Sequence, residues 1–182
     1  LIGGDPASRD PWRCALAMCW EAGLNWPGGP ASSGLARAAW ERRIHCPVTT
    51  SIGRVFDAAA ALIGLAHTQS HEGQAAMALE ARSAAAQEGI EIPLYRDDGL
   101  WRGDWAPLLP MLLDAERTRE ERAASFHASL AGLILRQAEQ IRRDYGVWQV
   151  GLAGGVFQNR CLTEQALLLL SDSGFVTLLP DR

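Results

Sequence analysis

Two adjacent glycines, Gly154 and Gly155, follow an apolar stretch and precede a segment with helical periodicity. Because neither has a Cβ atom, the backbone can approach a ligand closely at this point. The start of the following helix offers unpaired N–H groups and the positive end of a helix dipole, which together suit a phosphate. Asn159, in the first helical turn, can both donate to and accept from a nucleotide. The alternative is a tight strand-to-helix turn without a ligand, and the glycine pair taken alone favours that alternative.

A second candidate site lies at the predicted start of a helix, between Ser51 and Asp57. Gly53 leaves room for a ligand there, Arg54 can bind an anion, and Asp57, one turn further on, can accept a hydrogen bond from a hydroxyl group. The alternative is a capped helix with a surface ion pair, and this segment taken alone favours the alternative.

A third candidate is the pair Glu72 and Gly73. Glu72 can contact a ribose or a base, with Gly73 admitting the ligand. A carboxylate at a helix N-terminus also stabilises the helix without any further function, which is the competing interpretation. His127 is a fourth candidate, but it lies in helical register between Phe126 and Leu130, a position typical of a core or boundary histidine rather than a catalytic one.

The elements that position these residues are predicted to be mainly helices. Asp10 with Pro11 starts the first helix, a capping-box pattern at 118–121 starts the longest, and glycines such as Gly89 end several of them. Residues 23–34, rich in Gly, Pro and Ser, are predicted to form a loop. The predicted helices are Pro11 to Ala22, Leu35 to Arg43, Ile52 to Ile63, Glu72 to Gln87, Pro107 to Ala115, Thr118 to Tyr145 and Arg160 to Asp172.

Strand patterns are confined to two regions. Residues 90–95 alternate, and Leu100-Trp101 is predicted to return after a turn at 97–99. Residues 147–152 and 175–179 flank the last helix, and such a β-α-β unit predicts parallel strands. The expected fold is therefore α/β and helix-rich: a single unit over 1–182, with a mostly helical part at 1–146 and a small β-α-β unit at 147–182.

The composition is that of a globular domain, with 182 residues, 48% of them hydrophobic, and a net charge of −4. No basic stripe indicates nucleic-acid binding, and the longest apolar run, at 166–170, is far too short to span a membrane. Four cysteines without a CxxC pair predict free thiols and a reducing, cytoplasmic compartment. The sequence starts at Leu1 and stops directly after an apolar run, so we expect a piece of a longer polypeptide.

Taken together, these segments resemble the HypF family of carbamoyltransferases in order and spacing. The matching segments are GGDPASRDPWR at 3–13, TTSIGRVFD at 49–57, EGQAAMALE at 72–80, FH at 126–127 and GGVFQNR at 154–160. The resemblance covers nearly the whole chain, and the EGQAAM and GGVFQN segments are its most specific parts.

The resemblance implies a fragment of the C-terminal carbamoyl-transfer domain, which has an actin/sugar-kinase/Hsp70-like (ASKHA) nucleotide-binding fold. It also implies the chemistry of that domain, which binds ATP or carbamoyl-adenylate and passes the carbamoyl group to the C-terminal cysteine of the partner protein HypE. That group is the precursor of the cyanide ligands of NiFe hydrogenases. The substrates of the full enzyme would be carbamoyl phosphate and ATP, and neither nucleic acid nor a membrane is an expected partner.

Family roles carry over to positions of this chain that match the motifs, all of them as nucleotide-binding residues and none as a catalytic residue. The family's divalent-metal ligands, a His-x-x-x-His pair and an Asp in an Asn-Asp-Gly-Gly segment, are expected outside the chain, because His67 and His71 have the spacing but lie in a predicted loop. The implied nucleotide-binding residues are Ser51, Gly53, Arg54, Asp57, Glu72, Gly73, Gly154, Gly155 and Asn159.

Two other interpretations stay open. One is a different enzyme of the same fold, such as a tRNA threonylcarbamoyl transferase or a sugar kinase; Arg54 and the Phe157-Gln158 pair favour HypF over it. The other is a non-catalytic helical interaction module whose glycines only turn the chain. Because the chain holds about one wall of the implied active site, we expect it to be inactive alone, with an exposed cleft face that allows self-association.

Overall fold

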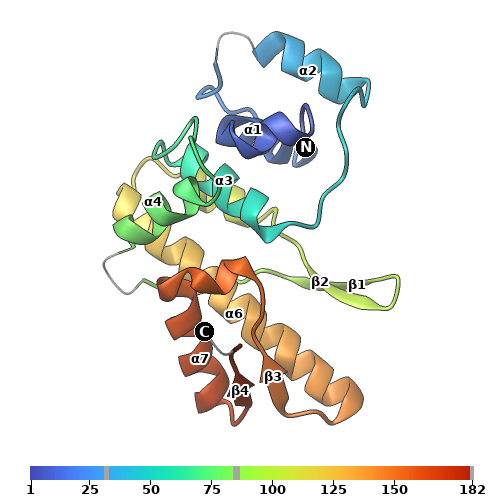
Figure 1. Ribbon diagram of the computed structural model, residues 1–182, viewed down its shortest axis with the longest axis vertical. Coiled ribbons are helices and arrows are strands. Elements are labelled where there is room, and N and C mark those ends of the chain that lie inside the picture. Colours follow the sequence, from blue (N-terminus) through green and yellow to red (C-terminus); the bar gives the residue numbers. More distant parts are fainter. Residues whose placement is uncertain (31–32, 84–86, 181–182) are drawn as a thin grey trace.

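The computed structural model describes residues 1–30, 33–83 and 87–180, which form an elongated and mostly helical molecule (Figure 1). Its class is the predicted one, α/β and helix-rich. One hydrophobic core runs through it, and every α-helix of the described residues contributes to this core. In chain order the elements are η1 (Asp5–Ser8), α1 (Pro11–Glu21), α2 (Ser33–Glu41), α3 (Ile52–Leu62), α4 (Gln74–Arg82), β1 (Leu94–Asp97), β2 (Leu100–Gly103), α5 (Leu108–Leu113), α6 (Arg119–Tyr145), β3 (Gln149–Gly151), η2 (Gly155–Gln158), α7 (Arg160–Asp172) and β4 (Val176–Leu178).

The packing of α1 on α3 forms the N-terminal part of the core. The four consecutive alanines at 58–61 of α3 are fully buried, and their small side chains let the helix backbones approach closely. Burial raises the pKa of Cys14 in α1 to about 12 and that of Cys19 to about 11, so both thiols stay protonated at neutral pH. The spacing of the apolar residues in α1 gives the helix one inner face, and the buried side chains on it include Trp12, Ala15, Leu16 and Cys19.

Helix α6 is the longest element and connects the two ends of the molecule (Figure 1). Its predicted start is confirmed, because Thr118 and Glu121 form a complete capping box, and Gly146 ends it with a φ of 69°. The apolar face of α6 is not buried near that end, where Ile141 and Tyr145 are 39% and 65% exposed. No helix in the described part of the chain is long and apolar enough to cross a membrane.

Helix α4 is shorter than predicted, and this changes the role of Gly89. The helix begins at Gln74 rather than Glu72 and ends at Arg82; residue 87 is not helical, and 84–86 lie outside the described residues. Gly89 therefore does not end a helix. A Cβ on Gly89 would lie 2.5 Å from the backbone nitrogen of Ser129 in α6, so only glycine permits this close crossing.

The predicted strand from Ile90 is wrong for its first four residues. Ile90 N donates to Ser129 Oγ at 2.9 Å, and the carbonyl of Ile92 accepts from Arg136, so residues 90–92 bond to side chains of α6 instead of a partner strand. The strand starts at Leu94 and pairs antiparallel with β2 in a hairpin that projects from the body of the molecule (Figure 1).

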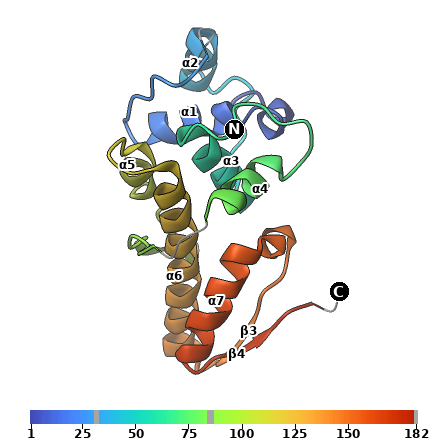
Figure 2. The same cartoon turned by 90° about the vertical axis from the view of Figure 1, so that its left-hand side faces the viewer.

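The C-terminal β-α-β unit has the predicted connectivity. Strands β3 and β4 pair in parallel, and α7 covers 160–172, the residues predicted for it. Helix α7 packs against both α6 and β4 (Figure 2). The residue before α7, Asn159, bonds to His127 of α6, and this contact ties the end of the glycine turn to α6.

We expect Gly89→Ala to lower the free energy of unfolding by about 1–3 kcal/mol, because the new methyl group meets the α6 backbone, which cannot rotate away. The matched control is Gly132→Ala within α6, where the nearest atom to the new Cβ is the end of the Arg136 side chain at 3.6 Å. That change should be neutral or stabilising, since alanine favours a helix. Urea denaturation measures both, and equal values for the two variants would contradict the close crossing.

Candidate functional site

Several polar side chains predicted to bind a ligand are grouped around a cavity of about 530 Å³ at the start of α3. Ser51, Arg54 and Glu72 all line it, and the opening segment of the chain closes another side. Positive charge comes from Arg9 and Arg54, and negative charge from Asp5 and Glu72. A cavity with both signs of charge suits a ligand that carries both phosphate and hydroxyl groups.

Next to this cavity, α3 buries an ion pair one helical turn apart. Asp57 is 2% exposed, and its Oδ2 lies 2.9 Å from Nη1 of Arg54. The contact lacks hydrogen-bond geometry, and neither of these two atoms has a hydrogen-bond partner among the described residues. Burial raises the pKa of Asp57 from 3.8 to about 6, although Arg54 and a hydrogen bond from Gln69 act in the opposite direction. The alternative of a surface ion pair is therefore wrong, because this pair lies inside the protein.

Gln69 is a residue of this site that the sequence analysis missed. Its buried side chain donates from Nε2 to the carbonyl of Ser8 and, at 3.3 Å, to Asp57 Oδ1. Its Oε1 accepts from the backbone N–H of Ala75 at 3.0 Å. One side chain thus joins η1, α3 and the first turn of α4. A glutamine in a loop carries no local signal of such a role, which only the contacts between distant segments reveal.

The predicted residues at the two helix starts differ in what they do. Ser51 is at the N-cap position of α3, but its side chain makes no cap hydrogen bond and is exposed at the cavity. Gly73 has a φ of 83° at the N-cap of α4, so its backbone requires glycine. Gly53 has no such requirement, since a Cβ there would meet only Ser51 Oγ, at an ordinary 3.5 Å.

The glycine turn is exposed and leads into the short helix η2. Gly154 has a φ of 102°, which L side chains rarely adopt, and a Cβ on either Gly154 or Gly155 would meet open space. Phe157 N donates to the carbonyl of Gly154, but Gly155 N and Val156 N donate to no acceptor in the described part of the chain. The turn itself therefore keeps two N–H groups for an anion.

The N-terminus of α7, in contrast, is not open to a ligand, and this corrects the prediction. Arg160 N and Cys161 N donate to Glu80 Oε1 at 2.6 and 3.3 Å, and Leu162 N donates to Asn159 Oδ1 at 2.9 Å. The carboxylate of Glu80, from α4, occupies the place where a phosphate was expected.

Asn159 itself faces the interior. It is 7% exposed, and its Nδ2 donates to Nε2 of the fully buried His127 at 3.1 Å. The carboxamide thus has protein partners for its oxygen and one N–H, and its predicted contact with a nucleotide stays a prediction. His127 is a core histidine, as its helical register indicated.

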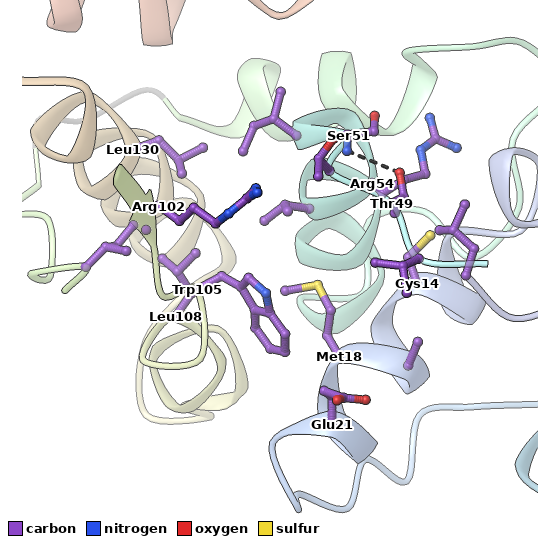
Figure 3. A pocket seen from close by; sticks show the side chains of 18 of the residues that line it. Cys14, Met18, Glu21, Thr49, Ser51, Arg54, Arg102, Trp105, Leu108 and Leu130 are labelled. Carbon is purple, nitrogen blue, oxygen red and sulfur yellow. Dashed lines mark hydrogen bonds between the residues drawn. The ribbon is translucent and has the colours of Figure 1, made fainter. Parts of the chain in front are cut away.

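A second, mostly apolar cavity of about 610 Å³ lies between α1, the start of α3 and the α5–α6 region. Figure 3 shows Ser51 and Arg54 on one side of it and Arg102 and Trp105 on the other. Val156 and Phe157 of the glycine-turn segment also line this cavity, whereas Gly154, Gly155 and Asn159 line neither cavity. The structure thus brings Ser51, Arg54 and Glu72 together at the polar cavity and buries Asp57 beside them, and Val156 and Phe157 are the residues of the glycine-turn segment that share the apolar cavity with Ser51 and Arg54.

Among residues 1–30, 33–83 and 87–180, no three His, Cys, Asp or Glu side chains come together in a way that could hold a metal ion. His67 and His71, which have the family spacing, lie between α3 and α4, and His71 lines the polar cavity.

The helix-rich fold corresponds to a known class of transferase domain. The chain belongs to the carbamoyltransferase family, since the family model described as "Carbamoyltransferase, Kae1-like Domain, second subdomain" matches residues 1–182. Within that class the relatives are HypF proteins. The carbamoyltransferase HypF of Rhodobacter capsulatus is 36% identical over 97% of this chain, and that of Synechocystis sp. is 32% identical over 99%. The chain spans about a quarter of their length, 24% and 26% respectively.

Solved structures agree with this membership. A crystal structure of full-length HypF in the phosphate- and nucleotide-bound form matches 99% of this chain with a TM-score of 0.88 and 29% identity, over 30% of that protein's chain. The HypF of T. kodakarensis has a TM-score of 0.77 at 24% identity, which supports the fold.

We expect Asp57 to titrate near pH 6 in the folded chain, because its carboxyl group is buried. Since this pKa lies above the unfolded value of about 3.8, the fold favours the protonated form, and the contribution of Asp57 to stability is greatest below about pH 4 and is lost as pH rises through 6. Carbonyl ¹³C NMR across this range measures the pKa, with exposed Asp98 as the control. A pKa below 4 for Asp57 would show that Arg54 outweighs burial.

Proposed function

We propose that this chain forms one wall of the nucleotide site in the carbamoyl-transfer domain of a HypF-type enzyme. The full enzyme would use ATP and carbamoyl phosphate to make carbamoyl-adenylate. It would then transfer the carbamoyl group to the C-terminal cysteine of HypE, as the precursor of the cyanide ligands of NiFe hydrogenases. The domain would have the ASKHA fold, in which a nucleotide lies between two lobes, and the protein would work in the cytoplasm.

The observation that carries this proposal is the polar cavity at the start of α3, where Ser51, Arg54 and Glu72 converge. The related full-length HypF was crystallised in a phosphate- and nucleotide-bound form, which supports a nucleotide as the ligand class. The guanidinium of Arg54 suits a phosphate, and the exposed carboxylate of Glu72 suits a ribose hydroxyl. Gly155 and Val156 offer two further N–H donors in the glycine turn.

In this proposal the chain positions the mixed anhydride and does not attack it. A divalent metal, with ligands from outside this chain, would neutralise the phosphate charge. The residues of this chain would hold the ribose and part of the phosphate and exclude water, so that the thiolate of HypE meets the carbamoyl carbon in a fixed geometry.

We expect Glu72→Gln to weaken ATP binding to the chain about three- to tenfold, because glutamine still accepts a hydrogen bond from a hydroxyl group but lacks the negative charge, which makes the bond to a carboxylate stronger by about 1 kcal/mol. Ser51→Ala should weaken it about three- to tenfold, as a neutral hydrogen bond does. Both side chains are exposed, so the fold should survive. The control is Glu164→Gln, an equally exposed carboxylate on α7. Isothermal titration calorimetry that gives the same Kd for all four proteins would remove the polar cavity from the nucleotide site.

We also expect the isolated chain to transfer no carbamoyl group. With the second lobe and the metal absent, the anhydride is held at one end only, and even small misplacements cost about a hundredfold in rate. The chain is incubated with ATP, carbamoyl phosphate and HypE, and the mass of HypE is then measured, with the full-length enzyme as the positive control. A carbamoyl adduct on the terminal cysteine at a rate near that of the full-length enzyme would show that the active site lies within this chain.

Gel filtration of the same sample measures the self-association expected of the exposed cleft face.

A further inference from the structure

The hydrogen bonds of buried His127 permit one arrangement of its protons. Nδ1 lies 2.8 Å from the carbonyl oxygen of Ala123, which can only accept, so Nδ1 carries a hydrogen. The oxygen of the Asn159 amide accepts from Leu162 N, so its nitrogen is the atom that faces His127. An amide nitrogen can only donate, and Nε2 must therefore be an unprotonated acceptor. His127 is neutral, in its Nδ1–H tautomer.

We infer that His127 is a positioning residue that fixes the Asn159 amide, and through it the 154–159 turn, by supplying this one acceptor. Without that acceptor the amide can rotate and point its nitrogen at Leu162 N, which ends the helix cap. The inference rests on the proposed function only where it connects the turn with nucleotide binding. The cap itself follows from the geometry alone.

Among the residues that the structure describes, Asn159 is the hydrogen-bond partner of His127 Nε2. The ring is 0% exposed and lies edge-on to Phe56 of α3 and to Phe126 of its own helix, with centroid distances of 5.6 and 5.7 Å. The charged group that acts on it is Glu80 of α4, the same residue that binds Arg160 N and Cys161 N. Burial lowers the pKa of His127, although the Ala123 carbonyl and Glu80 favour the charged form.

Protonation of His127 at Nε2 would break its hydrogen bond with Asn159. A hydrogen on Nε2 would face the NH₂ group of Asn159, and two donors cannot bond to each other. Either the amide rotates and the cap on Leu162 is lost, or the ring moves away from Asn159. Since the folded pKa lies below the ordinary value near 6.5, the stability that this contact provides is present above that value and is lost as pH falls below it. Positioning of the turn should therefore weaken on acidification.

Two variants separate positioning from simple packing. His127→Leu keeps an apolar group of similar size but removes the acceptor, and the Leu162 amide should then exchange with solvent about three- to tenfold faster. His127→Gln places a non-titrating oxygen acceptor near the Nε2 position, so it should restore protection and abolish the loss of protection as pH falls below the ordinary histidine pKa near 6.5. His67→Gln, the same change at an exposed histidine that stacks on Trp26, is the control.

NMR on the 182-residue chain measures amide exchange and the histidine ¹⁵N shifts. Calorimetry measures the affinity for ATP. We expect His127 to be unprotonated at Nε2 at pH 7, and ATP to bind His127→Leu about three- to tenfold more weakly than wild type or His127→Gln. A protonated Nε2 at pH 7, or equal Leu162 protection in His127→Leu and wild type, would overturn the inference. If His127→Leu does not fold, the pH dependence of Leu162 exchange in wild type against His127→Gln decides, and identical profiles overturn it. If wild type has the expected NMR pattern but binds no ATP, the positioning of the turn stands and the proposed function fails.

Discussion

The carboxyl group of Asp57 lies inside the protein, and the segments around the candidate site are arranged to accommodate it. Taking a carboxylate out of water costs several kcal/mol unless charges and hydrogen bonds compensate. Arg54 supplies the charge from the preceding helical turn, and Gln69 supplies a hydrogen bond. Because Gln69 also bonds to Ser8 and Ala75, the opening segment, α3 and α4 are fixed relative to one another by the needs of one buried group.

Helix α4 extends this arrangement from the polar cavity to the glycine turn. Glu72 precedes the helix at the cavity, and Glu80, near its other end, holds the first N–H groups of α7. The segment 72–80 thus has two acidic residues with different tasks, one exposed to a ligand and one bonded to a helix start. Helix α6 completes the frame, since it carries His127 on its buried face and packs against α4 and α7.

Features with local causes were predictable from the sequence. The capping box at Thr118, the glycine after α6 and the parallel β-α-β unit depend on neighbouring residues or on a general rule of chain connection, and all three are confirmed. The errors have long-range causes. Gly89 is required by the α6 backbone rather than by a helix end, and the chain after it bonds to α6 side chains instead of starting a strand.

The candidate site divides in the same way. The sequence identified Ser51, Arg54 and Glu72, and these do converge on one cavity. It did not identify Gln69 or the role of Glu80, because each bonds to segments far away in the chain and neither occurs in a pattern that predicts such contacts. It also could not show that Asp57 is buried, since the same i, i+3 spacing with Arg54 occurs on solvent-exposed helices.

A residue in a family's site motif can contact the ligand directly, or it can hold other parts of the protein in place. In this structure the burial of each side chain distinguishes these two roles. Ser51, Glu72 and Gly155 are exposed and free to meet a ligand, whereas Asp57 and Asn159 are buried and bonded to other side chains. Removing the Asn159 side chain would delete a helix cap, which by itself costs about 1 kcal/mol. A loss of activity in such a variant would therefore reflect the position of the turn as much as any contact with nucleotide. The exposed residues at the polar cavity are the ones whose substitution reports on binding itself.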